Sequence, residues 1–278
     1  MTVVSDDIDT DTGLFGPYSV TWRVHLEPVL FVGGLRALIL QALHPWVMLG
    51  TYQNSALFDP PKAFARFVRT AEFVGIRTYG STDEVERVAR RVRGLHSKLK
   101  GRDPATGRAF RLDDPQYLLW VHCGEIDSYA DVAVRAGILD GDAADRYIAE
   151  SVAAAEVVGA AEAPRSRAEM KAYFDEMRPR LRLTDEAITA TTNLMTARLP
   201  APTAVKLSQP PIAALAFATL PRWARRMYGS PGLPTTDLSA TLALKAFRAA
   251  VSRIPGPPEP PHMQRARRLM VAAGTLPG

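Results

Sequence analysis

The segment 35–43, L-R-A-L-I-L-Q-A-L, is the feature that most limits what this chain can fold into. It is apolar nearly all round a helical wheel, and such a helix must be covered by protein on every side. Pro28 suits the first turn of this helix, and Pro45 follows its end. Apolar residues repeat at helical spacing in most other segments, and the alternation typical of strands is scarce. The sequence therefore predicts an all-α protein, a single multi-helix domain around this central helix.

The stretch 81–101 predicts a second well-defined helix. Ser81 and Glu84 have the spacing of a capping box, and Gly101 follows two lysines at the other end. His96 lies one turn beyond Val92, so its imidazole is predicted to point inward. An inward imidazole costs desolvation unless a partner such as a metal accepts it. Helical spacing predicts one buried stripe: Val85, Val88, Val92, Leu95 and Leu99.

The remaining organisation follows from composition and turn signals. Residues 1–15 predict a flexible acidic arm, and 16–25 an extended or turn-like segment. The main helical domain is predicted over 16–254, with a small hairpin or irregular lid within 101–114. Residues 255–278 predict a Pro-rich spacer followed by a C-terminal basic helix.

Charge and cysteine content narrow the function classes. The chain has 278 residues and a net charge of +5, with basic residues in helical runs that suit anionic cofactors or peripheral membrane contact. No nucleic-acid motif accompanies these runs, so we expect no nucleic-acid partner. A single cysteine, Cys123, excludes an intrachain disulfide and a Cys-rich metal site. Signal-peptide features and an uninterrupted apolar span are missing, which predicts a cytoplasmic protein; the oligomeric state stays open.

The histidines carry the strongest chemical signal, because nucleotide-binding and nucleophile-elbow motifs are absent. Of five histidines, His44, His96 and His122 fall on the most apolar helical segments. This placement indicates a polar or metal-binding pocket inside a helical bundle. One histidine with an arginine nearby for propionates is typical of haem, whereas His122 with Glu125 suits a di-iron bundle. Core histidines without any ligand are the third interpretation.

Five motifs in order carry a family resemblance. They are W-R-V-H-x-E-P (22–28), L-R-A-L-I-L-Q-A-L-H-P (35–45), R-F-V-R-T-A (66–71), R-V-R-G-L-H (91–96) and L-L-W-V-H (118–122). Together they resemble the MpaB-like oxygenases, a family that includes the rubber oxygenases, or latex clearing proteins. The resemblance spans roughly residues 16–230.

The resemblance implies an all-α fold with a globin-like helical core, a b-type haem and dioxygen-dependent cleavage of an isoprenoid double bond. His96 would be the proximal haem ligand and the metal-binding residue. Arg66 and Thr70 match a conserved arginine and threonine of the rubber oxygenases' haem pocket, and Arg69 stands where those enzymes carry a lysine. The further residues expected to bind the cofactor or line its pocket are His44, Arg93 and His122.

Two departures shape the predicted function. The glutamate proposed as a base in rubber oxygenases has no counterpart here, and neither has the expected secretion signal. We therefore predict a haem b-dependent oxygenase that uses dioxygen on a small hydrophobic or isoprenoid-like molecule. Arg66, Arg69, Thr70 and His122 are its predicted catalytic residues, with His122 or His44 as the candidate proton donor or distal group. The alternatives are a non-catalytic haem- or lipid-binding helical protein and a non-haem di-iron bundle.

Overall fold

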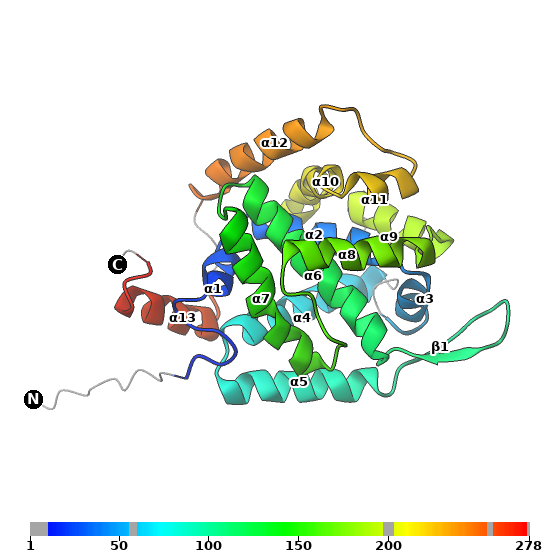
Figure 1. The fold of residues 1–278 in the computed structure, drawn as a ribbon, viewed down its shortest axis with the longest axis horizontal. Coiled ribbons are helices and arrows are strands. Elements are labelled where there is room, and N and C mark those ends of the chain that lie inside the picture. The colour runs from blue at the N-terminus through cyan, green and yellow to red at the C-terminus, as the bar shows by residue number, and fades with distance from the viewer. Residues whose placement is uncertain (1–10, 56–59, 197–202, 255–257, 277–278) are drawn as a thin grey trace, which may run out of the picture.

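The structure is a computed structural model that describes residues 11–55, 60–196, 203–254 and 258–276 (Figure 1). The described part is helical apart from one short antiparallel hairpin, so the predicted all-α single domain is confirmed. The elements in chain order are α1 (Val20–His25), α2 (Leu30–Gln41), α3 (Pro45–Asn54), α4 (Pro60–Tyr79), α5 (Thr82–His96), β1 (Lys100–Arg102), β2 (Ala109–Arg111), α6 (Pro115–Arg135), α7 (Gly141–Val158), α8 (Arg167–Met177), the 3₁₀ turn η2 (Arg178–Arg180), α9 (Asp185–Met195), α10 (Thr203–Ala218), α11 (Arg222–Met227), α12 (Thr236–Val251) and α13 (Pro261–Ala272).

Helices α2 and α6 lie against each other at the centre of the fold. Glycines on both helices allow this close approach. A Cβ atom on Gly33 would lie 2.8 Å from Cδ1 of Tyr129, and one on Gly124 would lie 2.9 Å from Cγ of Gln41. A larger side chain at position 33 would also meet the α6 backbone, since the Ser128 carbonyl oxygen lies 3.3 Å from that Cβ position, whereas one at position 124 would displace the Gln41 side chain. The all-round apolar segment of α2 is therefore covered closely by α6, as the sequence predicts for a central helix.

Arg36 is the one charged residue of α2, and it is buried in this crossing with 2% of its surface exposed. Its Nη1 donates to Oδ2 of Asp127 at 2.8 Å and to Oγ of Ser128 at 2.7 Å, both on α6. Its Nε donates to the carbonyl of Thr219, beyond the end of α10, at 3.1 Å. One guanidinium thus joins three segments that are far apart in sequence.

Helix α5 begins with the predicted capping box, because the Ser81 side chain and the Glu84 side chain each accept from the other's backbone N–H. The predicted buried stripe is wrong at Leu95, which is 52% exposed, whereas Ala89 is buried. At 100° per residue Leu95 is rotated about 80° from Val85, but His96 only about 20°. His96 is therefore on the side of the helix that faces the core.

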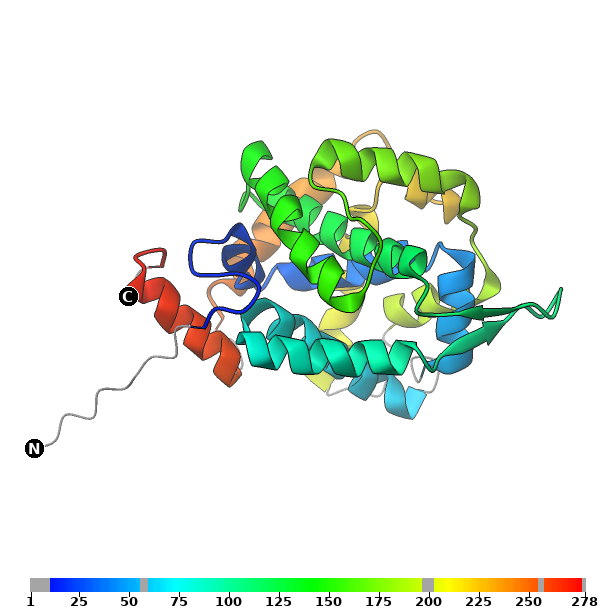
Figure 2. The same cartoon turned by 60° about the horizontal axis from the view of Figure 1, so that its bottom comes forward.

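Two further sequence-based expectations need correction or refinement. Residues 16–25 are not wholly extended, because α1 spans Val20–His25 and is capped by the Ser19 side chain, which accepts from the Trp22 N–H. The hairpin expected within 101–114 is confirmed, with Gly101 paired to Phe110, and it projects from one end of the molecule (Figure 2).

Helix α13 is docked on the domain. It packs against α4, and its residues join Trp22 and Tyr79 in a small second core. Arg265 donates to the Tyr79 carbonyl at 3.1 Å and pairs with Glu84 at 3.2 Å. Within the predicted arm, residues 1–10 lie outside the described residues, as do 255–257 of the predicted spacer.

Across the described residues, no single helix is long and apolar enough to cross a membrane. Only α2 and α3 taken together, bent by 104°, meet that test of length and composition.

We expect Arg36→Ala to lower the free energy of unfolding by about 3–5 kcal/mol, because it leaves the Asp127 carboxylate without its buried partner. Chemical denaturation of the purified variant measures this loss. Arg90→Ala is the control, since Arg90 and Glu86 form an exposed i,i+4 pair whose removal should change stability little. Equal stability of the two variants would contradict the central role of Arg36.

Candidate functional site

One face of α4 carries polar groups at both of its ends. Arg66, Thr70, Phe73 and Arg77 are spaced i, i+4, i+7 and i+11, so they share this face. The face extends over about 16 Å of helix. It lies near His96 at its start and near a buried group of titratable residues at its end.

His96 is the last residue of α5 and is half-buried. Its Nδ1 is buried and has no hydrogen-bond partner among the described residues. Burial lowers the pKa of His96, and the nearby charge of Arg66 lowers this pKa further, against the opposing effect of Asp113. The imidazole is therefore neutral near pH 7 and keeps a lone pair for a ligand.

Arg66 is half-buried beside His96, and its Nη1 donates to Oγ1 of Thr70. The Thr70 hydroxyl in turn donates to the Arg66 carbonyl at 3.0 Å. Burial lowers the pKa of Arg66, and the charge of Arg69 lowers it further. Among the described residues no carboxylate pairs with Arg66, which leaves this guanidinium available for an external anion.

The other predicted arginines lie further out. Arg69 is exposed on α4, one turn from Phe73. Arg93 is exposed on α5, and its Nη1 donates to the carbonyl of Val157 in the last turn of α7. Arg93 thus ties α5 to the C-terminus of α7, a position that favours a cation. Its predicted contact with a cofactor stays a prediction.

At the far end of the α4 face, Arg77 and Glu125 form a buried ion pair between α4 and α6. Nη2 of Arg77 lies 2.5 Å from Oε1 of Glu125, and Nη1 lies 3.3 Å from Oε2. Burial alone would raise the pKa of Glu125, but the charge and hydrogen bonds of Arg77 hold it below its usual value. Arg77 also lies over the ring of Phe73, 5.6 Å from the centroid.

His122 is next to this ion pair and only 3% exposed. Both of its ring nitrogens are buried without a hydrogen-bond partner in the described part of the chain. Burial lowers the pKa of His122 to about 4, although the Glu125 carboxylate opposes the shift. Glu125 uses its carboxylate on Arg77, so the histidine–carboxylate pair considered for a di-iron site is not formed.

His25 approaches the same ion pair from α1. Its Nε2 is 2.9 Å from the hydroxyl of Tyr147 on α7, and its ring makes an edge contact with Tyr129 on α6. Burial lowers the pKa of His25 to about 4. We define the buried polar cluster as the residues that meet here: His25, Arg77, His122, Glu125, Tyr129 and Tyr147.

Sequence reasoning missed the roles of Arg77, His25, Tyr129 and Tyr147. For Arg77 a signal existed, because it repeats the helical face of Arg66 and Thr70 three turns from Arg66. The other three come from α1, α6 and α7, and nothing in the spacing of one helix indicates that they meet.

His44 is buried and caps α3, since its Nδ1 accepts from the Val47 N–H at 3.3 Å. Its ring contacts Tyr117 and Trp120, with centroids 5.3 and 5.8 Å away. Burial lowers the pKa of His44 to about 4. His44 therefore has a structural task at a helix start, and its predicted place in a cofactor pocket stays untested.

Comparisons with known proteins agree with this arrangement of motifs. A family model described as "ER-bound oxygenase mpaB/B'/Rubber oxygenase, catalytic domain" matches residues 22–253. No curated protein and no solved structure matches the sequence. In the described residues, no group of three or more His, Cys, Asp or Glu side chains is arranged to hold a metal ion by itself.

The buried histidines predict a loss of stability in mild acid. The pKa of His122 is about 4 when folded and near 6.5 when unfolded, so the unfolded chain binds more protons between these values. The contribution of His122 to the free energy of unfolding is fully present above pH 6.5. It is lost as the pH falls towards 4, and the loss is at most about 3 kcal/mol. We expect His122→Leu to flatten the pH dependence of the unfolding free energy between pH 7 and 5. Parallel curves for the variant and the native chain would contradict this.

Proposed function

This chain belongs to the family of mpaB/B' and rubber oxygenase catalytic domains, and on that premise we propose that it is a haem b-dependent oxygenase. Membership gives the chain a general oxygenase role, with dioxygen and an organic substrate. The proposal adds the cofactor, the residues that hold it and the substrate class.

The observation that carries the proposal is the environment of His96. Its imidazole is on the core side of α5, neutral near pH 7, with a buried Nδ1 that has no partner in the described chain. A single neutral histidine is a common axial ligand of haem iron. The donor set suits haem better than a bare ion, because no group of three or more His, Cys, Asp or Glu side chains is arranged to hold an ion in the described residues.

Arg66 and Thr70 support the same cofactor. A half-buried guanidinium without a carboxylate partner in the described chain suits an anionic group such as a haem propionate, and the Thr70 hydroxyl holds the guanidinium in place. Arg69 on the exposed side of α4 would add positive charge near the same edge. When bound, haem would supply an iron that can bind dioxygen.

His122 would act as a neutral group. Burial lowers its pKa to about 4, so at pH 7 the ring has one N–H donor and one acceptor and carries no charge. It can therefore orient a bound molecule by a hydrogen bond or accept a proton, but it is not an imidazolium acid. This refines the role of proton donor that the sequence suggested. The Arg77–Glu125 pair next to it fixes α4 against α6.

The proposed substrate is a small hydrophobic or isoprenoid-like molecule, and the proposed location is the cytoplasm. Family membership supports a substrate that reacts with dioxygen. The isoprenoid-like carbon skeleton of this substrate is the part to be tested.

We expect His96→Ala to lose bound haem. The measurement is the Soret band and the pyridine haemochrome of protein purified from cells supplied with iron and a haem precursor. The native chain should contain b-type haem in near-stoichiometric amount, because His96 would bind its iron. His262→Ala is the matched control, since His262 is a half-buried histidine on α13, and it should keep its haem. A normal haem spectrum of His96→Ala would refute the ligand assignment.

His122→Ala should keep haem but lower turnover, by about 100-fold if its proton transfer or hydrogen bond assists the chemical step. Dioxygen consumption with an unsaturated isoprenoid such as squalene measures turnover, and the haemochrome assay measures retention. A native chain that binds haem yet consumes no dioxygen with any unsaturated lipid would favour a non-catalytic haem-binding protein.

A further inference from the structure

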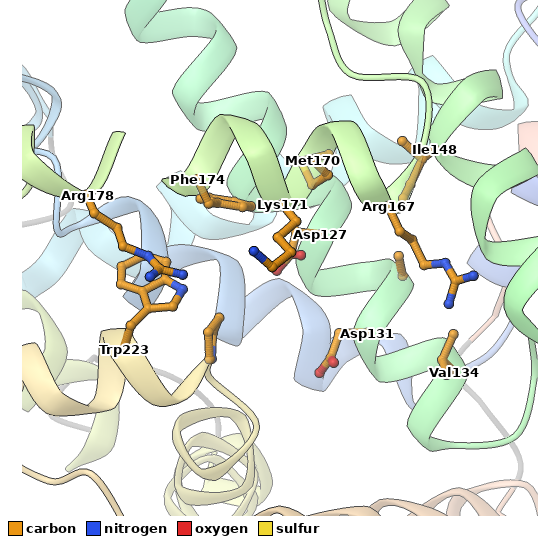
Figure 3. A pocket seen from close by; sticks show the side chains of 12 residues that line it. Asp127, Asp131, Val134, Ile148, Arg167, Met170, Lys171, Phe174, Arg178 and Trp223 are labelled. Atoms are coloured by element: carbon orange, nitrogen blue, oxygen red, sulfur yellow. The ribbon is translucent and has the colours of Figure 1, made fainter. Parts of the chain in front are cut away.

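A cavity of about 310 Å³ lies between α6, α7, α8 and α11 (Figure 3). None of the predicted cofactor or catalytic residues lines it. Its volume is at the lower end of the range for small-molecule sites. The surfaces inside it are mostly apolar, from Ala130, Ile148, Met170, Phe174 and Trp223.

The two charged walls of the cavity differ in how their charges are balanced. Asp127 and Asp131 on α6 form one wall, and each already holds an arginine. Asp127 pairs with Arg36 at 2.8 Å, and Asp131 pairs with Arg135 at 2.8 Å. The α6 wall therefore has no net negative charge to offer a cation.

The opposite wall belongs to α8 and η2 and is positive. Lys171 and Arg178 share a single carboxylate, that of Asp175, with 2.6 Å to each cation. The third cation, Arg167, is balanced by Asp145 at 3.2 Å. Lys171 and Arg178 thus have one carboxylate between them in the ion pairs of the described residues.

An aromatic surface adjoins Arg178. The guanidinium of Arg178 lies over the ring of Trp223, 5.4 Å from the centroid, and Figure 3 shows the two at one end of the cavity. Phe174 is next to Trp223, with ring centroids 6.0 Å apart. An apolar body can pack here while its charged end stays near Lys171 and Arg178.

We propose that this cavity is a second ligand site, separate from the cofactor site, and that it binds a small amphiphilic carboxylate. The apolar part lies against Phe174 and Trp223, and the carboxylate binds Lys171 and Arg178. Asp175 does not line the cavity, but its two oxygens contact one cation each, so a single carboxylate can bind both. Binding replaces this exposed internal contact, which is weak.

The test uses three probes of one chain length: hexanoate, hexan-1-ol and hexylammonium. We expect hexanoate to bind at least about threefold more tightly than hexan-1-ol, and hexylammonium to bind most weakly. Calorimetry of the full chain as purified gives the affinities. The change in tryptophan fluorescence should disappear in Trp223→Phe, which locates the site. Because binding is measured directly, the result is independent of whether the chain is an oxygenase.

Two variants should move hexanoate affinity in opposite directions. Lys171→Ala removes a cation and should weaken binding about three- to tenfold, whereas Asp175→Asn removes the internal competitor and should tighten it severalfold. Lys245→Ala, an exposed lysine on α12 away from the cavity, is the matched control and should change nothing. The proposal would be overturned if hexylammonium bound more tightly than hexanoate, or if hexanoate and hexan-1-ol bound equally. Equal effects of Lys171→Ala and Lys245→Ala would also overturn it, and so would no binding at about 10 mM.

Discussion

The fold depends on a single buried guanidinium. Arg36 is at the crossing of α2 and α6, where Gly33 and Gly124 bring the two helices into close contact. A charge at that depth is tolerable only when its hydrogen bonds are satisfied, and Arg36 finds acceptors on α6 and beyond α10. The same bonds fix the rotation of α6 about its axis. With α6 in this rotation, His122, Glu125 and Tyr129 face α4 and α7. Asp127 and Asp131 face the opposite side.

Arg66 differs from the buried arginines in the partner of its guanidinium. Arg36 has Asp127, Arg77 has Glu125, and Arg225 has Asp237 as a carboxylate partner. Arg66 is half-buried and has only the neutral hydroxyl of Thr70 among the described residues. Desolvating a cation without an anion costs free energy, and an anion from outside the described chain would offset this cost. The carboxylate of the proposed cofactor, next to the neutral His96, would be such an anion.

The sequence was informative where a signal is local. The capping box at Ser81 and Glu84 starts α5 as predicted, and the inward direction of His96 follows from its near alignment with Val85. Leu95 was misjudged because a hydrophobic side chain 80° from the stripe still resembles a member of it. The buried polar cluster could not be predicted in full, since His25 and Tyr147 meet through the packing of α1 on α7, a contact across 122 residues of chain.

Asp127 lines the cavity beneath α8 and also pairs with Arg36 at the central crossing. This double role affects which ligand can bind in the cavity without destabilising the core. A cation drawn to Asp127 would compete with Arg36 for a bond that holds α2, α6 and Thr219 together. Its binding would therefore be opposed by a loss of core stability. An anion on the α8 wall disturbs only the exposed contacts of Asp175, whose partners Lys171 and Arg178 are themselves 75% and 45% exposed. A carboxylate is therefore favoured mainly because its binding would disrupt weaker contacts than the binding of a cation would. The number of charges on either wall matters less.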